Sequence, residues 1–275
     1  MRDAAGRGQV APLGDWLSMT WQVITGDCLE VMPTLPAGSI DAILTDLPYG
    51  TTACSWDSVI PFEPMWAAIK HVLKPRGVFV TTASQPFTSA LVMSNPKWFK
   101  YEWVWNKKHA VGFQIAKYRP MMQHENVTVF SPSSPKYNPI MTPRPKTKSR
   151  GSYSARPESA SPLKYDDGKD RSYNEWYPKS IIEIGNAHQA AKVHPTQKPV
   201  ALYEYLIRTY TNEGETVLDM TAGSGTTGVA AINTGRNVIL IEKREDYADI
   251  ARRRCTEAME QARQLAMPLG AGVED

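Results

Sequence analysis

Residues 216–228 read Thr216-Val-Leu-Asp-Met-Thr-Ala-Gly-Ser-Gly-Thr-Thr-Gly228, and this stretch decides the fold. A short apolar strand ends at Asp219, glycines follow at 223, 225 and 228, and a helical pattern begins at once. Glycines let the backbone approach a ligand closely, and a helix N-terminus offers free N–H groups. Glu242 ends the next apolar strand, where a carboxylate can accept hydrogen bonds from two ribose hydroxyls. The stretch therefore predicts a nucleotide-type ligand site on an α/β sheet.

Apolar strands and amphipathic helices alternate along the rest of the chain. The pattern predicts strands over 42–45, 77–81, 101–105, 126–130, 216–218 and 238–241, and helices over 62–73, 200–210, 227–233 and 245–265. Strands interleaved with helices favour a mostly parallel sheet with both faces covered. We expect residues 1–20 to be a poorly ordered leader and 267–275 to be a tail. The two parts 21–130 and 194–266 then flank an insert at 131–193.

Basic residues are concentrated in this insert, although the net charge of the chain is only +3. The insert is rich in Pro, Ser, Lys and Arg and lacks apolar periodicity, so we expect it to be loop-rich. Between residues 136 and 156 there is no acidic residue, and the basic residues are Lys136, Arg144, Lys146, Lys148, Arg150 and Arg156. Such a patch can neutralise nucleic-acid phosphates, although a solvated loop has the same composition. Lys107 and Lys108, after the strand at 101–105, are equally compatible with phosphate contact and with solvent.

The cysteines Cys28, Cys54 and Cys255 are few and widely spaced. They form no CxxC pair and no metal-ligand spacing, so we expect neither a disulfide framework nor a metal site. A reducing, cytoplasmic compartment is the simplest interpretation. Because no apolar run approaches the roughly 18 residues of a membrane span, we expect no membrane partner.

A second group of residues, Asp46-Leu47-Pro48-Tyr49, follows the strand at 42–45, where open α/β sheets bind ligands. These residue types suit catalysis at an exocyclic amino nitrogen of a base, whose lone pair is delocalised into the ring. The Asp46 carboxylate and the Leu47 carbonyl can accept the two amino hydrogens and favour a pyramidal nitrogen. Pro48 fixes the direction of that carbonyl, and Tyr49 offers an aromatic face to an extruded base. When the amino nitrogen is itself the nucleophile, the reaction needs neither a cysteine nucleophile nor a metal.

The two motifs resemble those of the amino-group DNA methyltransferases. That family has a catalytic motif Asp/Ser/Asn-Pro-Pro-Tyr/Phe and often a cofactor motif Asp-Pro-Phe-Ala-Gly-Ser-Gly-Thr-Thr, which 219–227 resembles. The catalytic motif comes first here, as in the β class. Three further segments are similar to this class, so the resemblance covers most of residues 22–255: Gly26-Asp-Cys28, Ser39-Ile-Asp41 and His194-Pro-Thr-Gln-Lys-Pro199. Leu47 departs from the pattern because it replaces the usual first proline.

The resemblance implies an α/β, Rossmann-like S-adenosylmethionine-dependent methyltransferase fold with circularly permuted motifs and a mostly parallel mixed sheet with helices on both faces. Residues 21–130 are then the catalytic half, 131–193 a target-recognition insert and 194–266 the cofactor-binding half. S-adenosylmethionine is the implied cofactor and S-adenosylhomocysteine its product. Asp27 is implied at the adenine amino group, Lys198 and Thr226 near the methionine carboxylate, and Glu242 on the ribose. The complete expected cofactor-binding set is Asp27, Cys28, Lys198, Asp219, Ala222, Gly223, Ser224, Gly225, Thr226, Thr227 and Glu242.

The expected activity is methylation of adenine N6 in double-stranded DNA, because cytosine enzymes of this class more often have Ser where Asp46 stands. N4-cytosine methylation, RNA or protein-glutamine methylation and a catalytically silent DNA-binding homologue remain alternatives. A nicotinamide dehydrogenase also fits the glycine spacing, but Asp219 suits a methionine ammonium better than a pyrophosphate. The class suggests a cytoplasmic bacterial or phage-encoded enzyme, with restriction–modification as one setting. A homodimer is open, although no seam in the sequence indicates one.

Overall fold

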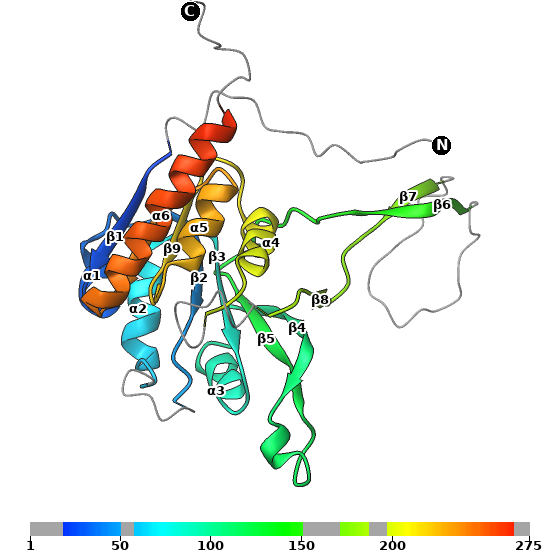
Figure 1. Ribbon diagram of the computed structural model, residues 1–275, viewed down its shortest axis with the longest axis horizontal. Helices are drawn as coiled ribbons and strands as arrows, with labels where there is room; N and C mark the ends of the chain where they lie inside the picture. The colour runs from blue at the N-terminus through cyan, green and yellow to red at the C-terminus, as the bar shows by residue number, and fades with distance from the viewer. Residues whose placement is uncertain (1–18, 51–57, 151–170, 187–196, 267–275) are drawn as a thin grey trace, which may run out of the picture. The chain divides into compact units, whose positions relative to one another are not determined.

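The computed structural model describes residues 19–50, 58–150, 171–186 and 197–266 (Figure 1). The chain divides into two compact units, the first formed by residues 1–138 and 180–275 and the second by Pro139–Lys179. The second unit spans fewer residues than the expected insert at 131–193. Its flanks belong to the first unit, because the Asn138 N–H donates to the Thr209 carbonyl at 2.7 Å and residues 181–183 join the main sheet.

The described part of the first unit contains one eight-stranded sheet in the order β1-β10-β9-β2-β3-β5-β4-β8. Its strands are β1 (Trp21–Thr25), β2 (Ile40–Asp46), β3 (Leu73–Ala83), β4 (Phe99–Val111), β5 (Met122–Phe130), β8 (Ile181–Glu183), β9 (Thr216–Asp219) and β10 (Asn237–Glu242). Neighbouring strands are parallel from β1 to β3, β5 is antiparallel to β3 and β4, and β8 is parallel to β4. The prediction of a mostly parallel, mixed sheet is confirmed.

Helices cover both faces of this sheet. One layer contains α1 (Cys28–Val31), the 3₁₀ turn η2 (Met32–Thr34), α2 (Phe62–Val72) and α3 (Phe87–Ser94), and the other contains α4 (Val200–Tyr210), α5 (Thr226–Asn233) and α6 (Glu245–Ala266). Side chains alternate along β2, because Ala42 and Leu44 pack with the second layer and Ile43 with the first. No helix in the described ranges is long and apolar enough to cross a membrane.

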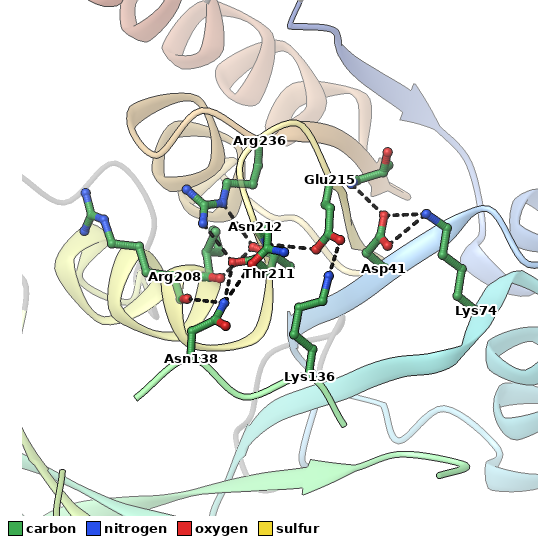
Figure 2. Close-up of polar contacts among 11 residues, drawn as sticks. Asp41, Lys74, Lys136, Asn138, Arg208, Thr211, Asn212, Glu215 and Arg236 are labelled. Carbon is green, nitrogen blue, oxygen red and sulfur yellow. Dashed lines mark hydrogen bonds and ion pairs between the residues drawn. The ribbon is translucent and has the colours of Figure 1, made fainter. Parts of the chain in front are cut away.

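A polar cluster holds the chain where it leaves β5, beside the amino ends of β2 and β9 (Figure 2). The Lys136 ammonium pairs with the Glu215 carboxylate, which precedes β9. The side-chain amide of Asn138 donates to the carbonyls of Arg208 and Thr211, at 3.3 and 3.1 Å. Because Lys136 is already engaged in an ion pair within the first unit, we separate it from the other five basic residues expected to bind DNA.

The second unit contains a two-stranded antiparallel ribbon. Strands β6 (Thr142–Arg150) and β7 (Arg171–Trp176) pair so that Thr142 lies opposite Trp176. Arg144 stabilises the ribbon, because its Nε donates to the Glu175 carbonyl at 2.8 Å and its guanidinium lies 5.1 Å from the Trp176 ring centroid. The insert thus has more regular structure than its composition predicts. Arg156 and the side chains of Lys148 and Arg150 lie outside the described residues.

Candidate active site

A cavity of about 770 Å³ lies at the carboxyl ends of the central parallel strands. Asp46 ends β2, Asp219 ends β9 and Glu242 ends β10, and all three line the cavity. Strands β2 and β9 are neighbours in the sheet, with Ile43 opposite Leu218. The two motifs are distant in sequence but lie side by side, as the proposed chemistry requires. All the expected catalytic and cofactor-binding residues line this cavity except Gly225.

The glycine turn between β9 and α5 is held by the Glu242 carboxylate. One oxygen of Glu242 accepts a hydrogen bond from the Gly223 N–H at 2.7 Å, and the other accepts from the Arg244 N–H at 2.9 Å. Gly225 has φ +79°, and a Cβ there would lie 2.8 Å from the Cβ of Ala251 in α6. Gly225 therefore permits close packing of the turn against α6, which explains its absence from the cavity wall.

Asp219 is a buried carboxylate at the base of the turn, with 3% of its surface exposed. It accepts hydrogen bonds from the hydroxyls of Thr45, at 2.7 Å, and Thr227, and from the Thr221 N–H at 3.1 Å. Burial raises the pKa of Asp219 to about 6, against the opposing effect of these hydrogen bonds. The carboxylate can therefore change its charge between mildly acidic and neutral solution.

Asp27 and Cys28 form the wall where β1 leads into α1. Asp27 caps that helix by accepting from the Leu29 N–H at 2.9 Å, and it pairs with Lys243 at 3.0 Å. The helix hydrogen bond is the main reason that the pKa of Asp27 is lowered, and Lys243 adds to it. Burial raises the pKa of Cys28 to about 11, so its thiol is protonated and poorly nucleophilic at neutral pH.

The turn at residues 46–49, the expected catalytic turn, is organised around the Asp46 carboxylate. Its Oδ1 accepts hydrogen bonds from the Tyr49 hydroxyl, at 2.8 Å, and from the Thr82 hydroxyl. Its Oδ2 accepts a hydrogen bond from the Lys198 ammonium at 2.7 Å. The main-chain carbonyl of Asp46 accepts from the Thr221 hydroxyl at 3.0 Å, which links the catalytic and cofactor turns directly. The structure thus places Lys198 on the Asp46 carboxylate, whereas the family resemblance implied a position near the methionine carboxylate.

Packing fixes the residues on either side of Pro48. The Leu47 side chain is 3% exposed and belongs to the apolar core, which anchors the turn at the position where the family usually has the first proline. The Tyr49 ring stacks on Phe87, with 5.3 Å between centroids and 29° between planes. Burial, reinforced by the charge of Asp46, raises the Tyr49 pKa well above its usual value. Tyr49 is therefore a protonated donor to Asp46, and the Lys198 ammonium lies 5.7 Å from the centroid of its ring.

The cavity residues that were not predicted from the sequence as site residues include the polar side chains of Lys107, Glu125 and Tyr203. Lys107 is 6% exposed and donates to the Glu125 carboxylate at 3.1 Å. The interpretation of Lys107 as a solvated lysine is therefore wrong. The second Glu125 oxygen lies 3.4 Å from the Lys198 ammonium. Tyr203, on α4, is buried, and this burial raises its pKa well above the usual value. Glu125 lies in the polar run Gln123-His-Glu-Asn126 at the start of β5, so no alternation of apolar residues pointed to it.

The comparison with known families identifies the class of protein that this fold and cavity define. The profile of the N6/N4 DNA methylase family matches residues 40–253, which is most of the chain. The chain belongs to this family and is a DNA methyltransferase of the amino-group type. No group of His, Cys, Asp and Glu side chains suited to a metal ion occurs among the residues that the structure describes.

Curated relatives and solved structures agree with this assignment. The chain is 27% identical over 255 residues to the type II methyltransferase M.HpaI of Haemophilus parainfluenzae, covering 86% of this chain and 74% of the relative. It is 28% identical over 261 residues to M.HinfI of Haemophilus influenzae, covering 86% and 68%. The structure resembles M1.HpyAVI solved with S-adenosylmethionine, with TM-score 0.57, 24% identity and coverage of 86% and 100%. It also resembles the cytosine-N4-specific PvuII DNA methyltransferase, with TM-score 0.60, 19% identity and coverage of 89% and 93%. These two likenesses establish the shared Rossmann-like methyltransferase fold.

Proposed function

We propose that this protein transfers a methyl group from S-adenosylmethionine to N6 of an adenine extruded from double-stranded DNA. The observation that carries the proposal is the position of the Asp46 carboxylate beside the Asp219 turn, within one cavity. A methyl donor on the turn and a base on Asp46 would share that cavity. The resemblance to a chain solved with S-adenosylmethionine supports the choice of cofactor.

The side chains around the glycine turn fit S-adenosylmethionine. Each Glu242 oxygen accepts one backbone N–H and keeps a lone pair that can accept from a ribose hydroxyl. Asp219, when ionised, is a negative group suited to the methionine ammonium, and Asp27 is an acceptor suited to the adenine amino group. When bound, the cofactor supplies an electrophilic methyl group on a sulfonium. Three carboxylates around one turn suit such a cation better than the pyrophosphate of a dinucleotide.

The catalytic turn then provides acceptors for the reacting amino group. The Asp46 carboxylate and the Leu47 carbonyl accept its two hydrogens, which keeps the nitrogen lone pair available for attack on the methyl group. The Tyr49 and Thr82 hydroxyls hold Asp46 Oδ1, so the orientation of the carboxylate is set before the base arrives. The residues hold the nucleophile in place, and no covalent enzyme intermediate is needed.

DNA binding is proposed for two basic surfaces. One is the insert, with Arg144, Lys146, Lys148, Arg150 and Arg156. The other is the tip of the β4–β5 hairpin at residues 108–121, which includes the 3₁₀ turn η3 (Phe113–Ile115) and extends past the covering helices in Figure 1. This hairpin tip has the exposed basic residues Lys108, Lys117 and Arg119 and no acidic residue. Phe113 and Tyr118 are 79% and 78% exposed beside them, which suits stacking on nucleobases.

Analysis of methylated nucleosides tests this proposal. Double-stranded DNA is incubated with the protein and S-adenosylmethionine, digested and separated by mass. We expect N6-methyldeoxyadenosine with the wild type and none with Asp46→Ala, while Asp46→Ala still binds the cofactor. Asp41→Asn is a matched control, because Asp41 pairs with Lys74 near the other end of β2, at 2.8 Å. N4-methyldeoxycytidine would move the proposal to the cytosine alternative, and full activity of Asp46→Ala would overturn the mechanism.

A further inference from the structure

Lys198 lies between two carboxylates, and it is closer to one of them than to the other. Its ammonium donates to Asp46 Oδ2 at 2.7 Å and lies 3.4 Å from Glu125 Oε2. The three side chains are 11%, 23% and 15% exposed for Lys198, Asp46 and Glu125. Glu125 Oε2 is buried and, apart from this 3.4 Å ion pair with Lys198, has no hydrogen-bond partner among the described residues. A buried carboxylate oxygen that receives only a long contact is incompletely satisfied, so its position beside a lysine requires an explanation.

Asp46 is nearly saturated with donors in this arrangement. A carboxylate oxygen has about two acceptor positions. Both positions of Oδ1 are taken by Tyr49 and Thr82, and Lys198 takes one of those on Oδ2. A base that donates its amino hydrogen to Asp46 must therefore use the remaining position on Oδ2 and share that oxygen with Lys198.

The positive charge of Lys198 on Asp46 also opposes methyl transfer. The attacking nitrogen becomes positive as it takes the methyl group, and the Asp46 carboxylate stabilises that charge. An ammonium held on the same carboxylate weakens it as an acceptor and repels the developing cation. Glu125 offers Lys198 a second carboxylate within the same buried cluster, so the lysine can leave Asp46 without losing its counterion.

We propose that Lys198 passes from Asp46 to Glu125 when the target base binds. In the base-free protein Lys198 neutralises Asp46, and with the base bound it donates to Glu125 Oε2, which here receives only the longer 3.4 Å contact. Glu125 then acts as a positioning residue through Lys198, and Lys107 holds its other oxygen from the opposite side. This inference rests on the proposed role of Asp46 as the acceptor of the amino group.

A double-mutant cycle tests the exchange in single-turnover assays at saturating cofactor and DNA. Glu125→Gln removes the second counterion and leaves Lys198 on Asp46, so methyl transfer should slow by about tenfold, the size of coupling between contacting charges. Adding Lys198→Met removes the competitor, so the double variant should be faster than Glu125→Gln and close to Lys198→Met alone. Glu102→Gln is the matched control, because Glu102 is exposed on β4 and its carboxylate accepts a hydrogen bond from the Asn126 side chain at 3.1 Å.

The outcomes separate this inference from the proposed function. A double variant slower than Glu125→Gln, or a Glu125→Gln enzyme as fast as the wild type, would overturn the exchange while Asp46→Ala remains inactive. Activity in Asp46→Ala would instead overturn the underlying mechanism. Cofactor affinity of each variant shows that the fold is intact. If Glu125→Gln does not fold, the exchange is tested by a structure of the wild type with S-adenosylhomocysteine and a duplex that it methylates. The exchange requires Lys198 to lie nearer Glu125 than Asp46 in that complex, and a lysine still on Asp46 would overturn it.

Discussion

The Thr45 hydroxyl donates a 2.7 Å hydrogen bond to the Asp219 carboxylate, joining the ends of strands β2 and β9. Both residues are buried, with 1% and 3% of their surfaces exposed. The bond connects the strand that carries the catalytic turn to the strand that carries the glycine turn. It also favours the charged form of Asp219, which burial disfavours, and the balance leaves the pKa of Asp219 at about 6.

Cofactor affinity should therefore depend on pH through Asp219. If the ionised carboxylate binds the methionine ammonium, only molecules with deprotonated Asp219 are competent to bind. With a pKa of about 6, the ionised fraction falls from about 0.9 at pH 7 to about 0.1 at pH 5. We expect the S-adenosylmethionine dissociation constant to rise about tenfold over this range, as measured by calorimetry.

Variants identify the group responsible for this pH dependence. Asp219→Asn should bind the cofactor weakly and with a flat profile between pH 5 and 7. Glu242→Gln should keep the wild-type slope, because Asp219 is unchanged in that variant. A wild-type profile that is flat, or a slope that persists in Asp219→Asn, would remove the ammonium role from Asp219.

Residues at strand ends could be predicted from the sequence because their position follows from topology. Parallel strands place their carboxyl ends at one edge of a sheet, so Asp46, Asp219 and Glu242 were expected to converge. Tyr203 and Glu125 could not be found in this way. They reach the cavity from α4 and from the antiparallel β5, and no local pattern specifies which distant residues they meet.

The expected ends of several elements agree closely with the structure, because apolar periodicity fixed them. The predicted helix at 200–210 matches α4 completely. The ribbon of β6 and β7 was not predicted because β6 is rich in Pro, Lys and Arg and β7 is mostly polar, so neither strand has a run of apolar residues. Lys198 was assigned by resemblance to the methionine carboxylate, and its contact with Asp46 depends on tertiary packing that the motif does not encode.

Gly225 should be far less tolerant of a side chain than Gly223. Both have positive φ, +79° and +51°, but a Cβ at Gly225 meets the backbone of Ala251 and a Cβ at Gly223 meets nothing within 4 Å. Gly223→Ala should lower the free energy of unfolding by the left-handed strain alone, about 1–2 kcal/mol. Gly225→Ala adds overpacking, for a loss of about 2–5 kcal/mol. Urea unfolding without cofactor measures both, and equal losses would contradict the close packing against α6.

Glu242 should contribute to cofactor affinity through its remaining lone pairs. Glu242→Ala should weaken S-adenosylmethionine binding by about 1–3 kcal/mol, the scale of a lost charged hydrogen bond. Glu245→Ala is the matched control, because Glu245 lies three residues later, is exposed and pairs with Arg252 at 2.7 Å. A cofactor analogue without ribose hydroxyls should bind both variants equally. If Glu242→Ala binds the complete cofactor normally, Glu242 serves only to hold the Gly223 N–H.

The two basic surfaces can be compared by charge reversal and by the salt dependence of DNA binding. Changing Lys108, Lys117 and Arg119 to Glu removes up to three phosphate contacts from the hairpin tip. The slope of log affinity against log salt should then become shallower by about 2–3, because each phosphate contact contributes about 0.9. Changing Arg144 and Lys146 to Glu tests the insert in the same way, with an expected decrease of about 1–2.

Reversal of the exposed Arg76, Lys97 and Arg253, which lie away from the cavity wall, is the control for net charge. If the hairpin variant behaves like this control while the insert variant loses affinity, DNA contact belongs to the insert alone, and the exposed Phe113 and Tyr118 need another partner.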